Sequence, residues 1–254
     1  MEEFKLPNGQ MMFHLHQGEC LFLYREIFLR RCYLSDGITL DASSEGVVFD
    51  VGANIGMATY FFHEHSPKLK IHAVEPSPRT FEVLAANVNR MGIDAVLHRC
   101  AMAASAGTAT ITHYPSKSSM SGLYASPAAD RDTTKIYMEN EGMDPEDVEF
   151  VLADAFASET FEVELKTLSS VIDEYAIDRI ELLKVDVEKA ELDVLRGIRQ
   201  EHWPMIRQLV AEVHDIDHRV DTIAKLCRDH GLKVSVKQDQ KLEGTELYSL
   251  TALR

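Results

Sequence analysis

The chain has 254 residues, of which 45% are hydrophobic, so it is long enough to bury a substantial core. Its formal net charge of −15, with no cluster of Lys and Arg, argues against nucleic acids and anionic membranes as partners. The four cysteines are scattered without a C-x-x-C motif, and no signal peptide or membrane-spanning run is apparent. We therefore expect a cytoplasmic protein with free thiols.

Residues 1–45 precede the first predicted core strand and form an N-terminal extension, a candidate lid. Apolar residues at helical spacing predict a helix from Glu19 to Leu34, which Asp36-Gly37 ends. The apolar stripe is most simply a packing face on the main domain. Tyr24 on this helix is a weaker candidate for contact with a substrate.

The most informative stretch is a strand followed by a glycine-containing loop. Val47–Val51 is a short, β-branched, apolar run, typical of a buried strand. Gly52 and Gly56 bracket Ala53 and Asn54, and a helix opening follows. Because a Cβ at either glycine would hold a ligand away, this geometry suits a bound nucleotide or nucleoside. An ordinary strand-to-helix turn is the alternative interpretation.

The residues around this loop favour a particular cofactor. The spacing is G-x-x-x-G, not the G-x-G-x-x-G of dinucleotide sites. Asp50 near the strand end suits a cationic, phosphate-free nucleoside, and S-adenosylmethionine fits that description. Glu75 ends the next predicted strand, where an acid can accept both ribose hydroxyls, with Pro76 and Ser77 beside it. Ala101 ends the third strand and would sit near the adenine.

The rest of the chain continues the alternation of strands and helices, with one interruption. Residues 46–114 form the cofactor-binding half, and residues 161–254 form the substrate-side half. The segment between them, 115–160, breaks the rhythm with a small-residue loop and two helices, so it is an insertion and a second candidate lid. The expected elements after the glycine loop are helices over 78–92, 131–140, 144–156, 168–175, 190–198 and 217–230, and strands over 70–75, 95–101, 108–114, 161–165, 180–188, 206–214, 232–237 and 247–253. The last two strands are predicted to be antiparallel.

Two strand ends carry candidate catalytic groups for transfer of a methyl group to an alcohol. Asp186 and Glu188 end one strand, and Glu212 and His214 end another, two residues apart and thus on one face. His214 is the candidate general base, oriented by Glu212 or Asp186. The same three residues, Asp186, Glu212 and His214, could instead hold a divalent metal. The sequence does not decide between these alternatives.

These segments resemble a known family. Phe49–Gly56, followed by Val74-Glu75-Pro76, is similar to the first hallmark of the FkbM family of S-adenosylmethionine-dependent methyltransferases. Leu182–Leu192 with Leu195-Arg196-Gly197 resembles its second hallmark, although the family usually has glycine where Lys189 stands. The resemblance implies an α/β, class I (Rossmann-like) methyltransferase fold: a seven-stranded, mostly parallel sheet with helices on both faces. S-adenosylhomocysteine would be the product.

The flanking segments resemble FkbM-type O-methyltransferases of polyketide and non-ribosomal peptide synthases. These segments are Leu6–Gly9, Phe22–Phe28, Tyr114-Pro115 and Met120–Tyr124. The resemblance implies a hydroxyl acceptor on an intermediate tethered to an acyl carrier protein. The chain could be a domain excised from a multidomain synthase or a stand-alone enzyme. The resemblance points to Asp50, Gly52, Asn54, Glu75 and Ala101 around the cofactor, to Asp186, Glu212 and His214 at the acceptor, and to Met120, Ser121 and Tyr124 near the substrate. Alternatives are an O-methyltransferase of a free small molecule or sugar, and an inactive cofactor-binding domain that serves assembly.

Overall fold

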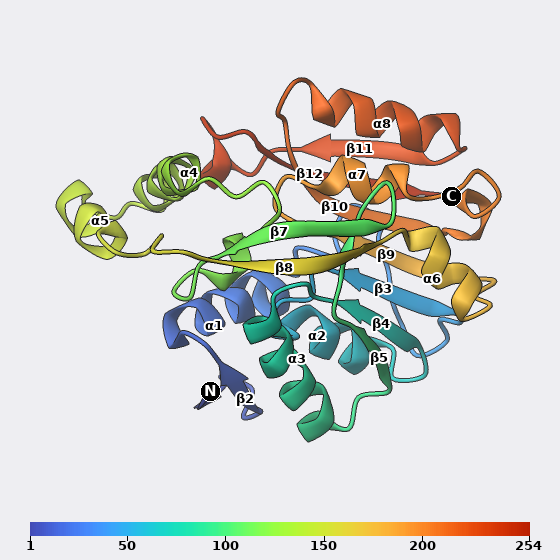
Figure 1. Ribbon diagram of the computed structural model, residues 1–254, viewed down its shortest axis with the longest axis horizontal. Helices are drawn as coiled ribbons and strands as arrows, with labels where there is room; N and C mark the ends of the chain where they lie inside the picture. Colours follow the sequence, from blue (N-terminus) through green and yellow to red (C-terminus); the bar gives the residue numbers. More distant parts are fainter.

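The computed structural model describes residues 1–254 and is built around one seven-stranded sheet (Figure 1). The spatial order of its strands is β11-β12-β10-β9-β3-β4-β5. Their bounds are β3 Val47–Val51, β4 Lys70–Val74, β5 Ala95–His98, β9 Ile180–Val185, β10 Gln208–His214, β11 Lys233–Lys237 and β12 Leu247–Leu253. Strand β12 pairs antiparallel with both β10 and β11, and the other pairs are parallel. The predicted mostly parallel sheet and antiparallel final pair are confirmed.

Helices cover both faces of this sheet, and each face has its own core (Figure 1). Helices α2 (Met57–His65) and α3 (Pro78–Met91) pack with Val48 and Ile71 on one face. Helices α6 (Leu168–Glu174), α7 (Glu191–Arg196) and α8 (Arg219–Asp229) pack with Phe49 and Leu183 on the other. Neighbouring residues such as Val48 and Phe49 serve opposite faces because side chains alternate along a strand, which explains the continuously apolar strands.

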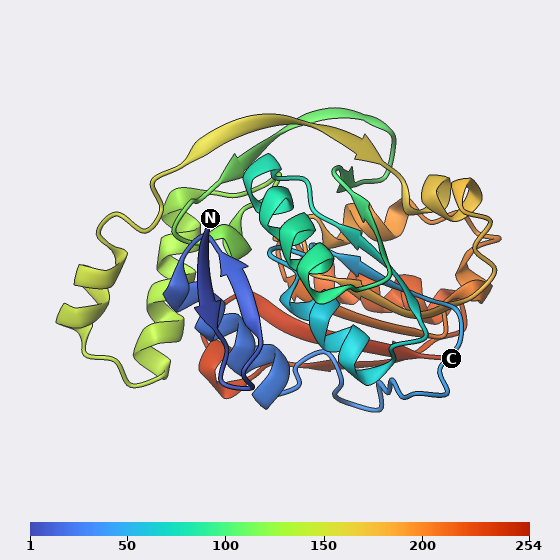
Figure 2. The same ribbon diagram turned by 90° about the horizontal axis from the view of Figure 1, so that it is seen from below.

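A second, three-stranded sheet arches over one end of the first (Figure 2). Its order is β6 (Ala101–Met102), β8 (Glu159–Lys166) and β7 (Gly107–His113). The predicted strand over 95–101 is therefore two strands in two sheets. The segment between β7 and β8 carries η2 (Ser118–Met120), α4 (Pro127–Asn140) and α5 (Pro145–Leu152) and protrudes from the main body (Figure 1). Helix α4 begins earlier than expected because a proline fits the first helical turn.

The N-terminal extension packs against the face covered by α2 and α3. It contains an antiparallel hairpin, β1 (Glu2–Lys5) with β2 (Met11–His14), and then α1 (Gln17–Tyr24) with a π-helical continuation, η1 (Arg25–Leu29). The helix predicted to reach Leu34 thus ends at Leu29, and the chain turns at Arg31, which has a left-handed φ of 55°. Short 3₁₀ turns, η3 (Trp203–Met205) and η4 (Gln240–Leu242), complete the elements. No helix has both the length and the apolar character needed to span a bilayer.

The strand predicted over 180–188 also ends early, at Val185. Glu188 and Lys189 have left-handed φ values of 51° and 74°, which a strand cannot accommodate. The chain therefore turns immediately after the sheet, and Asp186 and Glu188 lie in this turn and not in the strand.

We expect stability to fall as the pH drops from about 6.5 to about 4. His72 is 1% exposed in β4, and its Nδ1 lies 3.1 Å from Nε2 of His98. Burial, followed by the neighbouring His98, lowers the pKa of His72 from 6.5 to about 4. The folded state keeps the ring neutral while the unfolded chain takes up a proton, so stability that is present above pH 6.5 is lost as the pH approaches 4. Urea denaturation at several pH values measures this.

The variant His72→Leu should flatten the pH dependence of the unfolding free energy, while His63→Leu on the partly exposed side of α2 should leave it intact. An unchanged slope in His72→Leu would contradict the assignment of this acid sensitivity.

Candidate active site

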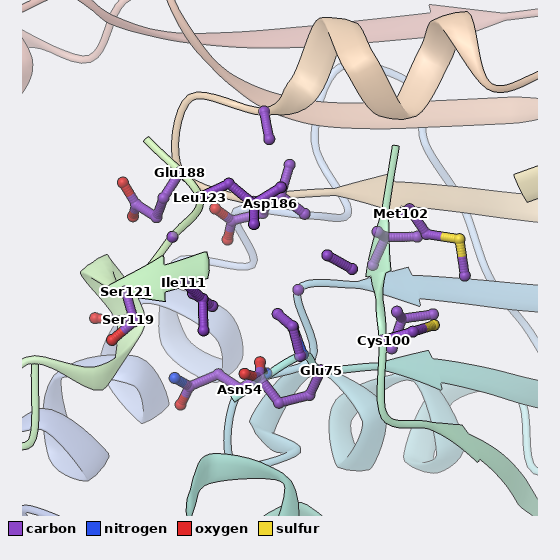
Figure 3. Close-up of a pocket in the computed structure, with 18 of the residues that line it drawn as sticks. Asn54, Glu75, Cys100, Met102, Ile111, Ser119, Ser121, Leu123, Asp186 and Glu188 are labelled. Carbon is purple, nitrogen blue, oxygen red and sulfur yellow. Dashed lines mark hydrogen bonds between the residues drawn. The ribbon is translucent and has the colours of Figure 1, made fainter. Parts of the chain in front are cut away.

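A pocket opens at the carboxyl ends of β3, β4 and β9, the edge at which open α/β sheets bind ligands (Figure 3). The space between its lining residues, including open solvent at the mouth, is about 520 Å³. Asn54 and Glu75 lie at one end, and Asp186 and Glu188 at the other (Figure 3). The lining residues are Val51, Gly52, Asn54, Val74, Glu75, Pro76, Cys100, Ala101, Met102, Ile111, Ser118, Ser119, Ser121, Gly122, Leu123, Asp186, Val187, Glu188 and Ala190.

The glycine loop lies directly against the turn that follows β9. Gly52 has a φ of 81°, and a Cβ there would lie 1.7 Å from the carbonyl oxygen of Asp186. No side chain fits, so glycine is required both by the backbone conformation and by the close approach. Gly56, with a φ of 90°, precedes α2 and meets Leu84 instead. The loop therefore brings the two ends of the pocket together.

Glu75 is held by backbone donors of the glycine loop and of the start of α3. Its Oε2 accepts from the Asn54 amide at 3.0 Å, and its Oε1 accepts from the Ser77 amide at 2.9 Å. Burial raises the pKa of Glu75 to about 7, although these two amides act in the opposite direction. Asn54 has a buried Oδ1 without a hydrogen-bond partner in the protein. An oriented carboxylate and an unsatisfied amide oxygen are suited to the hydroxyl and amino groups of a nucleoside.

Asp50 does not line the pocket, in contrast to the expected contact with a cofactor. Its carboxylate is fully buried, accepts from the Thr59 hydroxyl at 2.6 Å, and lies 3.1 Å from the ammonium of Lys184. Lys184 also donates to the Gly52 carbonyl at 2.6 Å. Burial opposes the charge on Lys184, but Asp50 and Asp186 outweigh it and raise its pKa. Asp50 thus supports the glycine loop through Lys184, which binds both Asp50 and the Gly52 carbonyl.

Three carboxylates lie close together at the end of the pocket away from Glu75, and we call them the acidic cluster. Asp186 and Glu188 line the pocket, and Glu212 lies beside them without lining it. One oxygen of each lies within 4.8 Å of the others. Burial, followed by the charges of Asp186 and Glu188, raises the pKa of Glu212 well above its usual value. Such a group of hard oxygen ligands could hold a divalent cation, or it could share a proton. Tyr33 donates a hydrogen bond of 2.6 Å to Asp186.

His214 is held differently from the expected general base. Its Nε2 lies 3.3 Å from Glu188 and its Nδ1 lies 3.1 Å from Glu191, so both ring nitrogens face carboxylates, and His214 does not line the pocket. Burial disfavours the charged ring, but hydrogen bonds to Glu188 and Glu191 prevail and raise its pKa to about 10. With both ring nitrogens bonded to carboxylates, His214 has no nitrogen free for a substrate proton or a metal in this arrangement. The geometry therefore supports the acidic cluster, and not a set with His214, as the reactive group.

The structure brings together some of the residues expected from the sequence and leaves others outside. Of the expected cofactor and substrate residues, the pocket contains Gly52, Asn54, Glu75, Pro76, Ala101 and Ser121. Ala53, Gly56 and Ser77 support it from adjacent backbone without lining it. The remaining substrate candidates point elsewhere: Tyr24 stacks on Phe28 at 5.0 Å, Met120 accepts from Thr134, and the half-exposed Tyr124 donates to Asp193.

Several residues of the site were missed by sequence reasoning. Lys184 carried a usable signal, because a charged residue in the middle of an apolar strand needs a buried partner. Glu19 and Tyr33 carried none, since they reach the site from an extension distant in sequence. The apolar wall of Cys100, Met102, Ile111 and Leu123 was also missed, because it depends on how the second sheet folds over the first.

The strand order, the glycine loop and the acid at the end of β4 together define a class I methyltransferase. The crystal structure of methyltransferase FkbM from Methylobacillus flagellatus KT has a similar fold, with a TM-score of 0.52 and 15% identity over 86% of this chain and 45% of that chain. Residues 50–233 match the methyltransferase FkbM domain. The chain therefore belongs to the FkbM family of S-adenosylmethionine-dependent methyltransferases.

Two relatives are similar over nearly the whole chain. The 31-O-demethyl-FK506 methyltransferase FkbM of Streptomyces tacrolimicus is 42% identical over 255 residues, which cover 100% of this chain and 97% of that protein. The AMB antimetabolite synthetase AmbE of Pseudomonas aeruginosa is 34% identical over 99% of this chain, which corresponds to 12% of the synthetase.

We expect Lys184→Met to destabilise the fold by about 3–5 kcal/mol, because it leaves Asp50 as an uncompensated buried charge. The double variant Lys184→Met with Asp50→Asn should recover part of that loss, because both charges are then removed. Chemical denaturation of the two single variants and the double variant measures the coupling. Strictly additive effects would contradict a direct Lys184–Asp50 interaction.

Proposed function

We propose that the protein transfers a methyl group to a hydroxyl of a polyketide- or peptide-derived compound. The observation that carries this proposal is the acidic cluster beside a pocket shaped for a nucleoside. S-adenosylmethionine, when bound, supplies the electrophilic methyl group on its sulfonium. The protein has to hold the acceptor oxygen in line and to receive its proton. A cluster of carboxylates at the far end of the pocket from Glu75 is suited to both tasks.

At the cofactor end, Gly52 allows close approach of the backbone, and Glu75 is the group we assign to the ribose hydroxyls. The Asn54 and Ser77 amides orient the Glu75 carboxylate before any ligand arrives. The wall for the adenine base is supplied by Pro76, Ala101 and the apolar Met102. These contacts match the parts of S-adenosylmethionine without requiring a phosphate site.

At the acceptor end, we assign the proton of the hydroxyl to Asp186. Asp186 and Glu188 both line the pocket, but Glu188 is bonded to His214, whereas Asp186 lies next to Gly52 at the cofactor end. Tyr33 fixes one of its oxygens. Glu212 does not line the pocket, so we do not assign the base to it. Burial and the neighbouring acids raise its pKa well above normal. His214 remains a cation that offsets Glu188 and Glu191.

Two forms of the acceptor are supported by different relatives. A carrier-bound intermediate is supported by the likeness to a segment of the synthetase AmbE. A free small molecule is supported by the Streptomyces relative, which is named for 31-O-demethyl-FK506 and which this chain matches over 97% of its length. The higher identity and the fuller coverage favour the free acceptor.

Glu75→Gln should weaken S-adenosylmethionine binding by roughly 10- to 100-fold, the usual loss for hydrogen bonds to a charged group. Because the pKa of Glu75 is raised to about 7, affinity in the wild type should be full above pH 7 and fall below it as the carboxylate is protonated. The variant should show no such fall. Calorimetric titration between pH 6 and 8 measures both effects, with the exposed Glu64→Gln as control. Wild-type affinity in Glu75→Gln would remove Glu75 from the cofactor site.

The acceptor is tested by incubating the protein with S-adenosylmethionine and either 31-O-demethyl-FK506 or a carrier protein loaded with a hydroxyacyl group. Mass spectrometry should detect one added methyl group. We expect transfer to persist in EDTA, because Lys184 and His214 already place positive charge beside the acidic cluster. Asp186→Asn should slow turnover about 10²- to 10⁴-fold, as expected for loss of a general base, with cofactor affinity retained.

Each of the other outcomes has a distinct meaning. Loss of transfer in EDTA, with recovery on adding Mg²⁺, would make the acidic cluster a metal site. Wild-type turnover by Asp186→Asn would exclude Asp186 as the base. Tight cofactor binding without transfer to either acceptor would favour an inactive domain with an assembly role.

A further inference from the structure

The N-terminal extension lies outside the residues that match the FkbM domain, 50–233, yet it supplies a buried carboxylate to the edge of the cofactor pocket. Glu19 is in the first turn of α1 and is 6% exposed. A buried carboxylate needs hydrogen-bond donors, and those of Glu19 come from the segment 117–122, which we call the cap segment. Both relatives named above align over at least 99% of this chain and therefore include the extension.

Glu19 binds the cap segment through both of its oxygens. Its Oε2 accepts from the Ser118 hydroxyl at 2.8 Å. Its Oε1 accepts from the Ser119 amide at 2.7 Å and from the Ser119 hydroxyl at 2.9 Å. Charge-assisted bonds of this kind are stronger than neutral ones, and losing one partner leaves the others buried and unsatisfied.

The cap segment is a wall of the cofactor pocket. Ser118, Ser119, Ser121 and Gly122 all line it. The Ser118 hydroxyl also accepts a hydrogen bond of 3.0 Å from the side-chain amide of Asn54. The backbone N–H of Asn54 donates to Glu75. A continuous hydrogen-bonded path thus runs from the N-terminal helix through the cap segment to the acid assigned to the ribose.

We propose that Glu19 is a positioning residue for cofactor binding, which holds the cap segment closed over bound S-adenosylmethionine. It acts through Ser118 and Ser119 and does not line the pocket itself. Release of the cofactor then requires the cap segment to separate from α1, so Glu19 governs the dissociation rate more than the association rate. The inference rests on the cofactor end of the proposed function and is independent of the acceptor.

The test uses Glu19→Gln, which keeps the shape of the side chain but offers one acceptor oxygen in place of two. Bound radiolabelled S-adenosylmethionine is chased with excess unlabelled cofactor to give the dissociation rate, and calorimetry gives the affinity. We expect dissociation to be about tenfold faster or more, the loss typical of a hydrogen bond to a charged group. The matched control is Glu3→Gln, a change in the same N-terminal extension that removes the charge of Glu3 from its surface ion pair with Arg90 of α3. It should leave both the dissociation rate and the affinity unchanged.

A second variant covers the case in which Glu19→Gln does not fold. Ser119→Ala removes one donor to Glu19 and should also speed dissociation. Where Glu19→Gln does fold, the double variant should show less than the sum of the two effects. A lowered melting temperature with a wild-type dissociation rate in the folded variant would overturn the proposal, because it would show a purely structural contact. Absence of cofactor binding by the wild-type protein would instead overturn the cofactor assignment, and the proposal with it.

Discussion

The ammonium of Lys184 is the charge on which the arrangement of the site depends. It is 1% exposed at the centre of the sheet and lies between Asp50, the Gly52 carbonyl and Asp186. A buried ammonium is tolerated only with such partners, so their positions around it are fixed together. Because Gly52 belongs to the glycine loop and Asp186 to the turn after β9, one buried cation fixes these two parts of the pocket relative to each other.

Neighbouring cations explain how several carboxylates can lie together at the end of the pocket away from Glu75. His214 lies between Glu188 and Glu191 as a cation, and Arg219 lies 3.9 Å from Glu191. Glu212 has no cation of its own among these contacts and is the group whose pKa is raised well above normal. The charges of Asp186 and Glu188 add to burial in raising that pKa. Asp186, which accepts a hydrogen bond from Tyr33, lines the pocket together with Glu188.

Sequence patterns were sufficient to predict the fold and several residues of the pocket. The other residues of the site depend on contacts between segments that are distant in sequence. Strand periodicity and the rule that ligands bind at carboxyl strand ends were sufficient to place Gly52, Glu75 and Asp186 in one pocket. They failed for Asp50, because its partner Lys184 stands opposite it in the β3–β9 register, which no local pattern specifies. They failed for His214 for the same reason: its role depends on Glu188 and Glu191, which approach it only because the chain turns after β9.

That turn also connects the site to the insertion. Two successive residues with left-handed φ, Glu188 and Lys189, are strained unless their surroundings hold them. The Lys189 amide donates to Glu191 at 2.7 Å, and the Lys189 ammonium forms an ion pair with Asp130 of α4. Asp130 in turn accepts from the Tyr114 hydroxyl at 2.8 Å. At Lys189 the chain thus combines backbone strain with an anchor, which ties the base of the insertion to the turn that carries Asp186 and Glu188. The end of the pocket at Asp186 and Glu188 therefore depends on how the insertion is attached to the turn after β9.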